Sequence, residues 1–429
     1  MPKSSSASNG HGPVEIKGQR NSNLEMLRIV SMLMIIIFHL LIHAGIADPK
    51  EPTFNTLVST VGCTFGLAAV VAFTMITGYF MVTQKITVTK ILRLLVEVWF
   101  YSIAIGVLAL ILLGSPIDET WIKATFFPIF TDQYWFISAY VMLVILSPFI
   151  NKCLNSITAK QHLLLVLVLL VISFGLFSIH TTFVMSKHLT LIVVYIIAAF
   201  IRLHPQEVFL NLRNSLMVLA YAIGSILLLS VLVNYLIYDK SLGWGPAAQI
   251  VAGMILVAAI AFCLRADKDR MFSRLFATVV ALMPLPMFLD LGYLTRSEVM
   301  FNYIGVMSGL TLLLGMALFL VFLNMKPRTN RVVNWIAAST FAVYLIHENP
   351  QFFRVIWSDW LGVPAYSDSY LFLPYVLFCA VSMFAIAIVL DKVRVYLIFK
   401  PLSRWTSRFY EWVEESVRKL SDRADEALK

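Results

Sequence analysis

The sequence predicts an all-helical integral membrane protein, a bundle of roughly ten to twelve transmembrane helices with both termini in the cytoplasm. Of its 429 residues 59% are hydrophobic and 13% are charged, and the mean hydropathy is +0.83. This composition leaves too few polar residues to cover the exterior of a soluble globule. Apolar runs of about 17 to 25 residues, the length that crosses a bilayer as a helix, recur along nearly the whole chain.

Hydropathy places twelve candidate spans, near residues 26–46, 58–81, 90–113, 134–152, 162–180, 188–203, 215–238, 247–264, 274–291, 301–323, 334–349 and 371–398. Three of these, 188–203, 274–291 and 334–349, are short, and Pro284 and Pro286 interrupt the second. Short segments of this kind can be tilted, re-entrant or buried within protein instead of crossing the bilayer.

The segments outside the membrane region are polar. Residues 1–22 are rich in Ser, Gly and Asn and are expected to be a disordered cytoplasmic tail in front of a membrane domain at 23–400. In residues 401–429 the apolar side chains recur at helical spacing, from Trp405 to Trp412 and beyond. This pattern predicts a cytoplasmic amphipathic helix, which either lies on the inner leaflet or simply ends the chain in solvent.

Charge and cysteine usage support a membrane protein and give no sign of a nucleic-acid partner. The 33 Lys and Arg exceed the 24 Asp and Glu, but they gather in short loops between apolar runs. Thirteen cations fall in the loops assigned to the cytoplasm and six in the alternate loops, as the positive-inside rule requires. The four cysteines have neither zinc-ligand spacing nor the density of a disulfide scaffold, so they are assigned to packing.

The first predicted span contains ionisable side chains, which are costly in a bilayer and usually mark function. In "NSNLEMLRIVSMLMIIIFHLLIHAG" Arg28 and His39 are eleven positions apart, which places them on one helical face roughly 16 Å apart. Arg28 would lie near the inner headgroups and His39 about halfway across. An apolar environment disfavours imidazolium, so His39 would remain a neutral base. Glu25 lies one turn before Arg28 and can pair with it.

Each of these residues also has a purely structural interpretation. Arg28 can be a positive-inside anchor whose side chain reaches the interface, as cations at helix ends commonly do. His39 can be a polar tie between helices, although a histidine in mid-membrane has no interface to reach. His43, one turn further on, lies nearer the outer surface. The first span alone leaves both interpretations open.

Four segments together resemble the type 3 membrane acyltransferase family. The first is the motif just described, an acidic residue three positions before an arginine that is followed by ten residues and a histidine. The other three agree in order and placement and are "FTMITGYFM" at 73–81, "DQYWFISAYVMLVILSPFINK" at 132–152 and "STFAVYLIHENP" at 339–350. The resemblance spans about residues 23 to 398.

The resemblance implies a reaction and a donor site. Members of the family move an acyl group, commonly acetyl from acetyl coenzyme A inside the cell, onto a glycan or other acceptor outside. Carried over by motif, His39 would be the catalytic base or a transient acyl carrier, and Arg28 would help to hold the coenzyme. Arg93 in "KILRLLVEVWF" matches the family's second basic position. With Lys85 and Lys90 it could contact the coenzyme phosphates, or it is a topology anchor.

Two further groups of residues are candidates for the acceptor side. Tyr134, Trp135 and Phe136 open the fourth predicted span from the outside, where they would line an acceptor cavity or form an interfacial aromatic belt. Tyr344 and His347 are three residues apart and share one side of a helix. They would face the same cavity from the outer end, unless His347 is a helix-end residue bonded to a loop.

Two departures from the family are evident. The predicted helix count exceeds the ten usual in the family, and the surplus falls around 242–300. Some members also carry a hydrolase-like domain outside the membrane after the membrane region, whereas a short tail follows here. The membrane domain would then complete the transfer itself, or a separate extracytoplasmic transferase would take part.

The sequence therefore predicts a multi-pass O-acyltransferase of the bacterial cytoplasmic membrane. It would move an acyl group, acetyl by default, from acyl-CoA to a hydroxyl of an envelope polysaccharide or glycolipid. No metal-ligand cluster and no nucleotide-binding glycine loop is evident, so acetyl-CoA or another acyl-CoA is the only expected cofactor and no metal is expected. The alternatives are a carrier or flippase for a glycan, lipid or small anion, and a nonenzymatic scaffold in the envelope.

Overall fold

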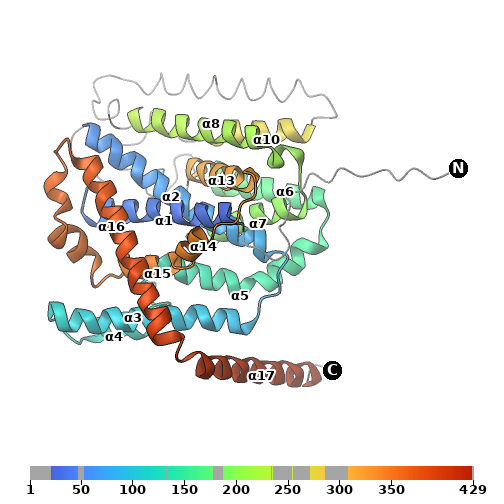
Figure 1. Cartoon of the computed structure of the whole chain (residues 1–429). Helices are drawn as coiled ribbons and strands as arrows, with labels where there is room; N and C mark the ends of the chain where they lie inside the picture. Colours follow the sequence, from blue (N-terminus) through green and yellow to red (C-terminus); the bar gives the residue numbers. More distant parts are fainter. Residues whose placement is uncertain are drawn as a thin grey trace.

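The computed structural model describes residues 21–46, 53–131, 133–176, 187–232, 234, 254, 271–285 and 308–427. Every regular element within these residues is a helix, which confirms the predicted all-helical class (Figure 1). The longest helices run roughly side by side as a bundle, and α16 crosses the others obliquely.

Six helices of the described part are long and apolar enough to cross a membrane. They are α1 (Ser22–His43), α2 (Phe54–Met81), α3 (Val88–Leu113), α5 (Trp135–Ser156), α8 (Leu212–Val231) and α16 (Phe372–Val393), which continues as a π-helical turn (Arg394–Phe399). Four shorter apolar helices accompany them, namely α6 (Ala159–Leu170), α7 (Lys187–Leu203), α10 (Met271–Leu282) and α13 (Gly309–Asn324). Each of the ten coincides with a predicted span.

The predicted span 334–349 is not one helix. It consists of α14 (Arg331–Ala337) and α15 (Thr340–His347), which are separated at Ser339. A helix of eight residues is roughly 12 Å long and cannot cross a bilayer; α15 is instead buried within the protein, whereas α14 is largely exposed.

Other differences concern short elements and the limits of the described residues. A short helix, α4 (Glu119–Phe126), lies between α3 and α5, where no element was predicted. The predicted amphipathic tail forms α17 (Ser403–Ala427). The predicted span 247–264 lies outside the described residues apart from Met254, and so does most of the predicted tail at 1–22.

Among the described residues, loops that were assigned to the cytoplasm meet at one end of the bundle. The Asn23 amide donates to the carbonyl of Met325 (3.1 Å), which joins the start of α1 to the loop after α13. The Asn151 amide donates to the carbonyl of Met81 (2.9 Å), which joins the ends of α5 and α2. At the opposite end, the Asn55 amide donates to the carbonyl of Ser367 (2.8 Å).

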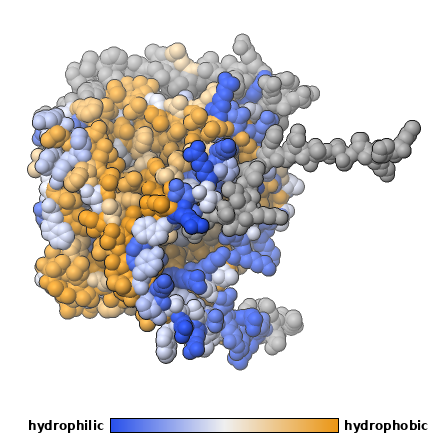
Figure 2. All heavy atoms as spheres, in the orientation of Figure 1, coloured by the Kyte–Doolittle hydropathy of each residue, from blue (hydrophilic) through white to orange (hydrophobic). Residues whose placement is uncertain are grey.

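The side of the bundle is apolar, as a surface in contact with lipid should be. Figure 2 shows hydrophobic residues over a broad area of the visible face and hydrophilic residues gathered toward one side of the view. Large exposed apolar side chains lie on several helices, for example Ile111 (72% exposed) on α3 and Phe149 (73%) on α5. In a soluble protein patches of this extent would be an aggregation liability.

Helix α2 is the centre of the packing, and glycines let its neighbours approach closely. A Cβ atom on Gly66 would lie 2.2 Å from the Cβ of Phe38 on α1. A Cβ atom on Gly78 would lie 2.8 Å from the backbone oxygen of Tyr195 on α7. On α13, a Cβ atom on Gly315 would lie 2.5 Å from the backbone oxygen of Ala68. Small residues at such contacts are typical of membrane helix packing, where close approach supplies dispersion energy.

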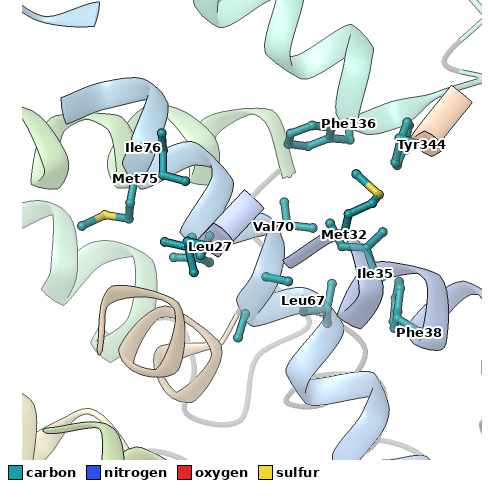
Figure 3. Packing of buried hydrophobic residues seen from close by; sticks show 14 of the residues in the cluster. Leu27, Met32, Ile35, Phe38, Leu67, Val70, Met75, Ile76, Phe136 and Tyr344 are labelled. Carbon is teal, nitrogen blue, oxygen red and sulfur yellow. The ribbon is translucent and has the colours of Figure 1, made fainter. Parts of the chain in front are cut away.

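The same contacts place α1 inside the bundle. Figure 3 shows side chains of α1 meeting those of α2, with Phe136 of α5 and Tyr344 of α15 beside Met32. Leu27, Ile36, Leu40 and Leu41 on α1 are all completely buried. Ser31 and His39 on the same helix are buried as well, so these polar side chains face other helices and not lipid.

Replacing Gly66 by alanine should destabilise the protein, because the new methyl group overlaps Phe38 and forces α1 and α2 apart. We expect a loss on the order of 1–3 kcal/mol, measured as a lower unfolding midpoint of the purified protein in detergent. Gly224→Ala on α8 is the matched control, since nothing lies within 4 Å of that Cβ position. Its midpoint should be unchanged or slightly raised. Equal losses in both variants would contradict the close-approach assignment.

Candidate active site

The site is built around His39 of α1 and the C-terminal end of α15. His39 Nδ1 lies 2.9 Å from Nε2 of His347 and 3.0 Å from Oε2 of Glu348. His39 is 4% exposed and His347 is completely buried. Two positions that were predicted separately, 308 residues apart in the chain, are therefore in direct contact.

The hydrogen bonds determine which nitrogen of each ring carries a proton. His347 Nδ1 lies 2.6 Å from the carbonyl oxygen of Val343, which can only accept, so Nδ1 is the protonated nitrogen. In the neutral ring Nε2 of His347 is then an acceptor, and His39 must donate to it from Nδ1. The Glu348 carboxylate is also an acceptor beside the same Nδ1. The neutral His39 ring therefore has its basic lone pair on Nε2.

Glu348 is held from two sides. Its Oε2 also lies 2.9 Å from His43 Nε2, one turn beyond His39 on α1. The His43 ring stacks on Phe353, with ring centroids 3.8 Å apart. The carboxylate thus lies between two imidazoles, where it stabilises positive charge on either of them.

Aromatic side chains surround the His39 ring. Tyr344 lies 5.9 Å from His39 between ring centroids, and Phe136 and Tyr134 lie 5.7 Å and 6.2 Å from Tyr344. The Tyr134 hydroxyl donates to the carbonyl of Leu345 (3.2 Å) and accepts from the Asn349 amide (2.8 Å). Tyr134 therefore fixes the end of α15 on which His347 lies.

Among the predicted acceptor residues, Tyr134, Tyr344 and His347 belong to this cluster. Trp135 is half-buried beside Phe136, with ring centroids 6.0 Å apart. It lies at the edge of the cluster, one residue from Tyr134. His347 lies within hydrogen-bond distance of His39.

The predicted donor residues lie toward the other end of the bundle. Arg28 Nη1 is 3.0 Å from Glu25 Oε1, as the spacing predicted, and the Arg28 side chain is 32% exposed. Arg93 lies on α3 with its guanidinium carbon 5.5 Å from the ring centre of Tyr410 on α17. Lys90 Nζ donates to the carbonyl of Lys85 (3.4 Å).

Helix α17 packs against the start of α3, next to Arg93 and Lys90. Tyr410 is 6% exposed, and burial raises the pKa of its hydroxyl while the nearby Arg93 opposes that shift. The Thr89 hydroxyl donates to the Glu414 carboxylate. One face of α17 is thus occupied by the protein itself, whereas Trp405 and Trp412 remain exposed.

A second buried polar cluster joins α3 and α16 to the start of α15. The Asp391 carboxylate accepts from the hydroxyls of Tyr101 (2.8 Å) and Ser339 (2.5 Å) and pairs with Arg394 (2.7 Å). Arg394 also pairs with Glu97 at 2.8 Å. Since Ser339 directly precedes α15, this cluster fixes the end of α15 opposite to His347.

Glu348, His43 and the Asp391 cluster were not predicted from the sequence as parts of a site. The signal was present, because Glu97 and Asp391 are acidic residues inside predicted spans, where ionisable groups need a partner. Asp391 and Arg394 have the i,i+3 spacing of a helical pair, but Glu97, Tyr101 and Ser339 come from distant parts of the chain and no local spacing identifies them.

These features define a polytopic membrane protein with a histidine buried in its first helix, in contact with a second buried histidine. A family model described as an acyltransferase domain, that of the acyltransferase 3 family, matches residues 21–268 and 189–392. The chain therefore belongs to the acyltransferase 3 family and is a membrane acyltransferase. Neither a curated protein sequence nor a solved structure gives a significant match.

Removing the Asp391 carboxylate should destabilise the protein, because Arg394 then loses one of its two carboxylate partners, and the Tyr101 and Ser339 hydroxyls lose their acceptor. For Asp391→Ala we expect a loss of about 3 kcal/mol, seen as a lower unfolding midpoint in detergent. Lys419→Ala is the control, since its pair with Glu415 is exposed on α17 and should leave the midpoint unchanged. An unchanged midpoint for Asp391→Ala would show that the cluster has no structural role.

Proposed function

We propose that this acyltransferase moves an acyl group, acetyl by default, from cytoplasmic acyl-CoA to a hydroxyl group of an envelope polysaccharide or glycolipid. Its location would be the bacterial cytoplasmic membrane. The observation that supports this most directly is the geometry at His39, where two acceptors face Nδ1 and the lone pair is therefore on Nε2. A neutral imidazole in a buried position is suited to remove a proton from a hydroxyl group.

The orientation of the reaction follows from the charges. The loops rich in Lys and Arg lie at the end of the bundle where α1 begins, and the positive-inside rule assigns that end to the cytoplasm. Arg28, Arg93 and Lys90 lie toward this end, where an anionic coenzyme would approach. Eleven residues of helix, roughly 16 Å, separate Arg28 from His39. The long pantetheine arm of coenzyme A can bridge that interval, with its phosphates near the arginines and its thioester near His39.

The proposed transfer uses Nε2 of His39. As the acceptor hydroxyl oxygen attacks the thioester carbonyl, Nε2 takes the hydroxyl proton, and His39 becomes an imidazolium that Glu348 stabilises. The carbon–sulfur bond then breaks, and the proton passes to the coenzyme A thiolate. The products are an ester and free coenzyme A. If His39 carries the acyl group transiently instead, the same nitrogen is the nucleophile.

The cluster at the end of α15 suits an acceptor that arrives from the outer end. Tyr344 and Trp135 offer aromatic faces of the kind that pack on sugar rings. The Tyr134 hydroxyl is already bonded to Leu345 and Asn349, so we assign Tyr134 a supporting role and not a contact with the acceptor. Either this domain completes the transfer alone or a separate extracytoplasmic transferase receives the acyl group.

Replacing His39 or Arg28 by alanine should abolish turnover of the donor. The assay follows hydrolysis or exchange of radiolabelled acetyl coenzyme A by the purified, detergent-solubilised protein. His188→Ala on α7 is the matched control, because it removes a histidine outside the site. Normal turnover by well-folded His39→Ala protein would refute the assignment of the base, and the absence of donor binding and turnover in the wild-type protein would favour a carrier.

Replacing Arg93 or Lys90 should weaken donor binding more than it slows chemistry, since these cations lie at the coenzyme end. For Arg93→Ala we expect KM for acetyl coenzyme A to rise on the order of tenfold with little change in kcat. Lys419→Ala, an exposed cation of α17, is the control and should leave both constants unchanged. If kcat falls with KM constant, Arg93 acts in the transition state and our donor-site assignment is wrong.

A further inference from the structure

We propose that His39, His347 and Glu348 also form a binding site for a divalent transition-metal ion of the Zn²⁺ type, and that the bound metal switches acyl transfer off. The metal site follows from the geometry of the three side chains alone. The switching effect rests, in addition, on the proposed function of His39.

The three potential ligand atoms are already close together. His39 Nδ1, His347 Nε2 and a carboxylate oxygen of Glu348 all lie within 4.8 Å of one another. Two of the separations are 2.9 Å and 3.0 Å. Ligand atoms around a tetrahedral zinc ion are roughly 3.3 Å apart, since each bond is about 2.0–2.2 Å long. These two separations would widen by a few tenths of an ångström to admit the ion, and the third, between His347 Nε2 and the Glu348 oxygen, would settle near the same value.

The set of ligands selects the class of metal. Two imidazole nitrogens and one carboxylate oxygen, with a fourth position for water or another anion, are a known zinc-binding set. Magnesium and calcium prefer sites made of oxygen atoms alone and would bind weakly here. One carboxylate also leaves a net positive charge on the complex, which favours an anionic fourth ligand such as hydroxide or chloride.

The surrounding residues hold two of the ligands in position. His347 Nδ1 donates to the Val343 carbonyl at 2.6 Å, so the lone pair on Nε2 points toward the cluster. A hydrogen bond from the second ring nitrogen is the usual way in which proteins orient a metal-binding histidine. His43 Nε2, 2.9 Å from Glu348 Oε2, restrains the carboxylate in the same manner.

Metal binding would remove the proposed base. The ion needs the lone pair of His39 Nδ1, so the proton that Nδ1 donates to its neighbours has to leave. In the neutral ring that proton then resides on Nε2, which becomes a donor and can no longer accept a proton from a hydroxyl group. Acyl transfer and metal binding are therefore mutually exclusive.

The test uses Co²⁺ as a spectroscopic substitute for Zn²⁺ on the full-length protein in detergent, after removal of any histidine tag. We expect the visible absorption bands of four-coordinate Co²⁺, and their loss when Zn²⁺ displaces the probe. The bands should disappear in His347→Ala and Glu348→Gln, with Zn²⁺ affinity falling by more than about tenfold. They should persist in His188→Ala, a histidine elsewhere in the bundle.

The outcomes separate this inference from the proposed function. Absence of the bands in the wild-type protein, or bands that survive in His347→Ala, would overturn the metal site whether or not the protein turns over acetyl coenzyme A. Inhibition of turnover by Zn²⁺ that is relieved by a chelator would support the switch. Full turnover with the metal bound would overturn the switch and leave the site. A protein that gives the bands but no turnover at all would contradict only the proposed function.

Discussion

The hydrogen bond between His39 and His347 is the contact on which the arrangement of the site depends. It joins α1 to α15, and these two histidines are 308 residues apart in the chain. Because a bilayer offers no water to satisfy polar groups, the side chains of these two helices must find partners in each other. The Val343 carbonyl orients the His347 ring. The His39 ring is in turn oriented by His347 and Glu348, and His43 restrains Glu348. The protonation of the His39 ring is thus a consequence of the fold.

The close contact of α1 with α2 keeps this polar cluster inside the protein. Gly66 brings the α2 backbone against Phe38, the residue next to His39. Gly315 brings α13 against the other face of α2, at Ala68. Both contacts work through dispersion at short range, which is the main attraction available between helices in lipid. The residues that stabilise the bundle and those that form the site are therefore neighbours on the same helices.

Features that depend on local periodicity were predictable from the sequence. The run of spans, the Glu25–Arg28 pair and the place of His39 on the first helix each follow from spacing along one element. The break in 334–349 was not predictable from hydropathy, because Ser339 is held by Asp391, which lies 52 residues away. The same holds for Glu348, whose partners His39 and His43 lie on α1, more than 300 residues earlier in the chain. Helix α4 is too short and too polar to register as a span.

The brevity of α15 has a mechanical consequence. Its eight residues form one rigid rod roughly 12 Å long, with Ser339 bound to Asp391 at one end and His347 bound to His39 at the other. A rod of this length has no internal joint, so a displacement of α16 relative to α3 would be transmitted directly to the imidazole pair. A change in the Asp391 cluster would then reach His39 through α15 alone, without a wider rearrangement of the bundle.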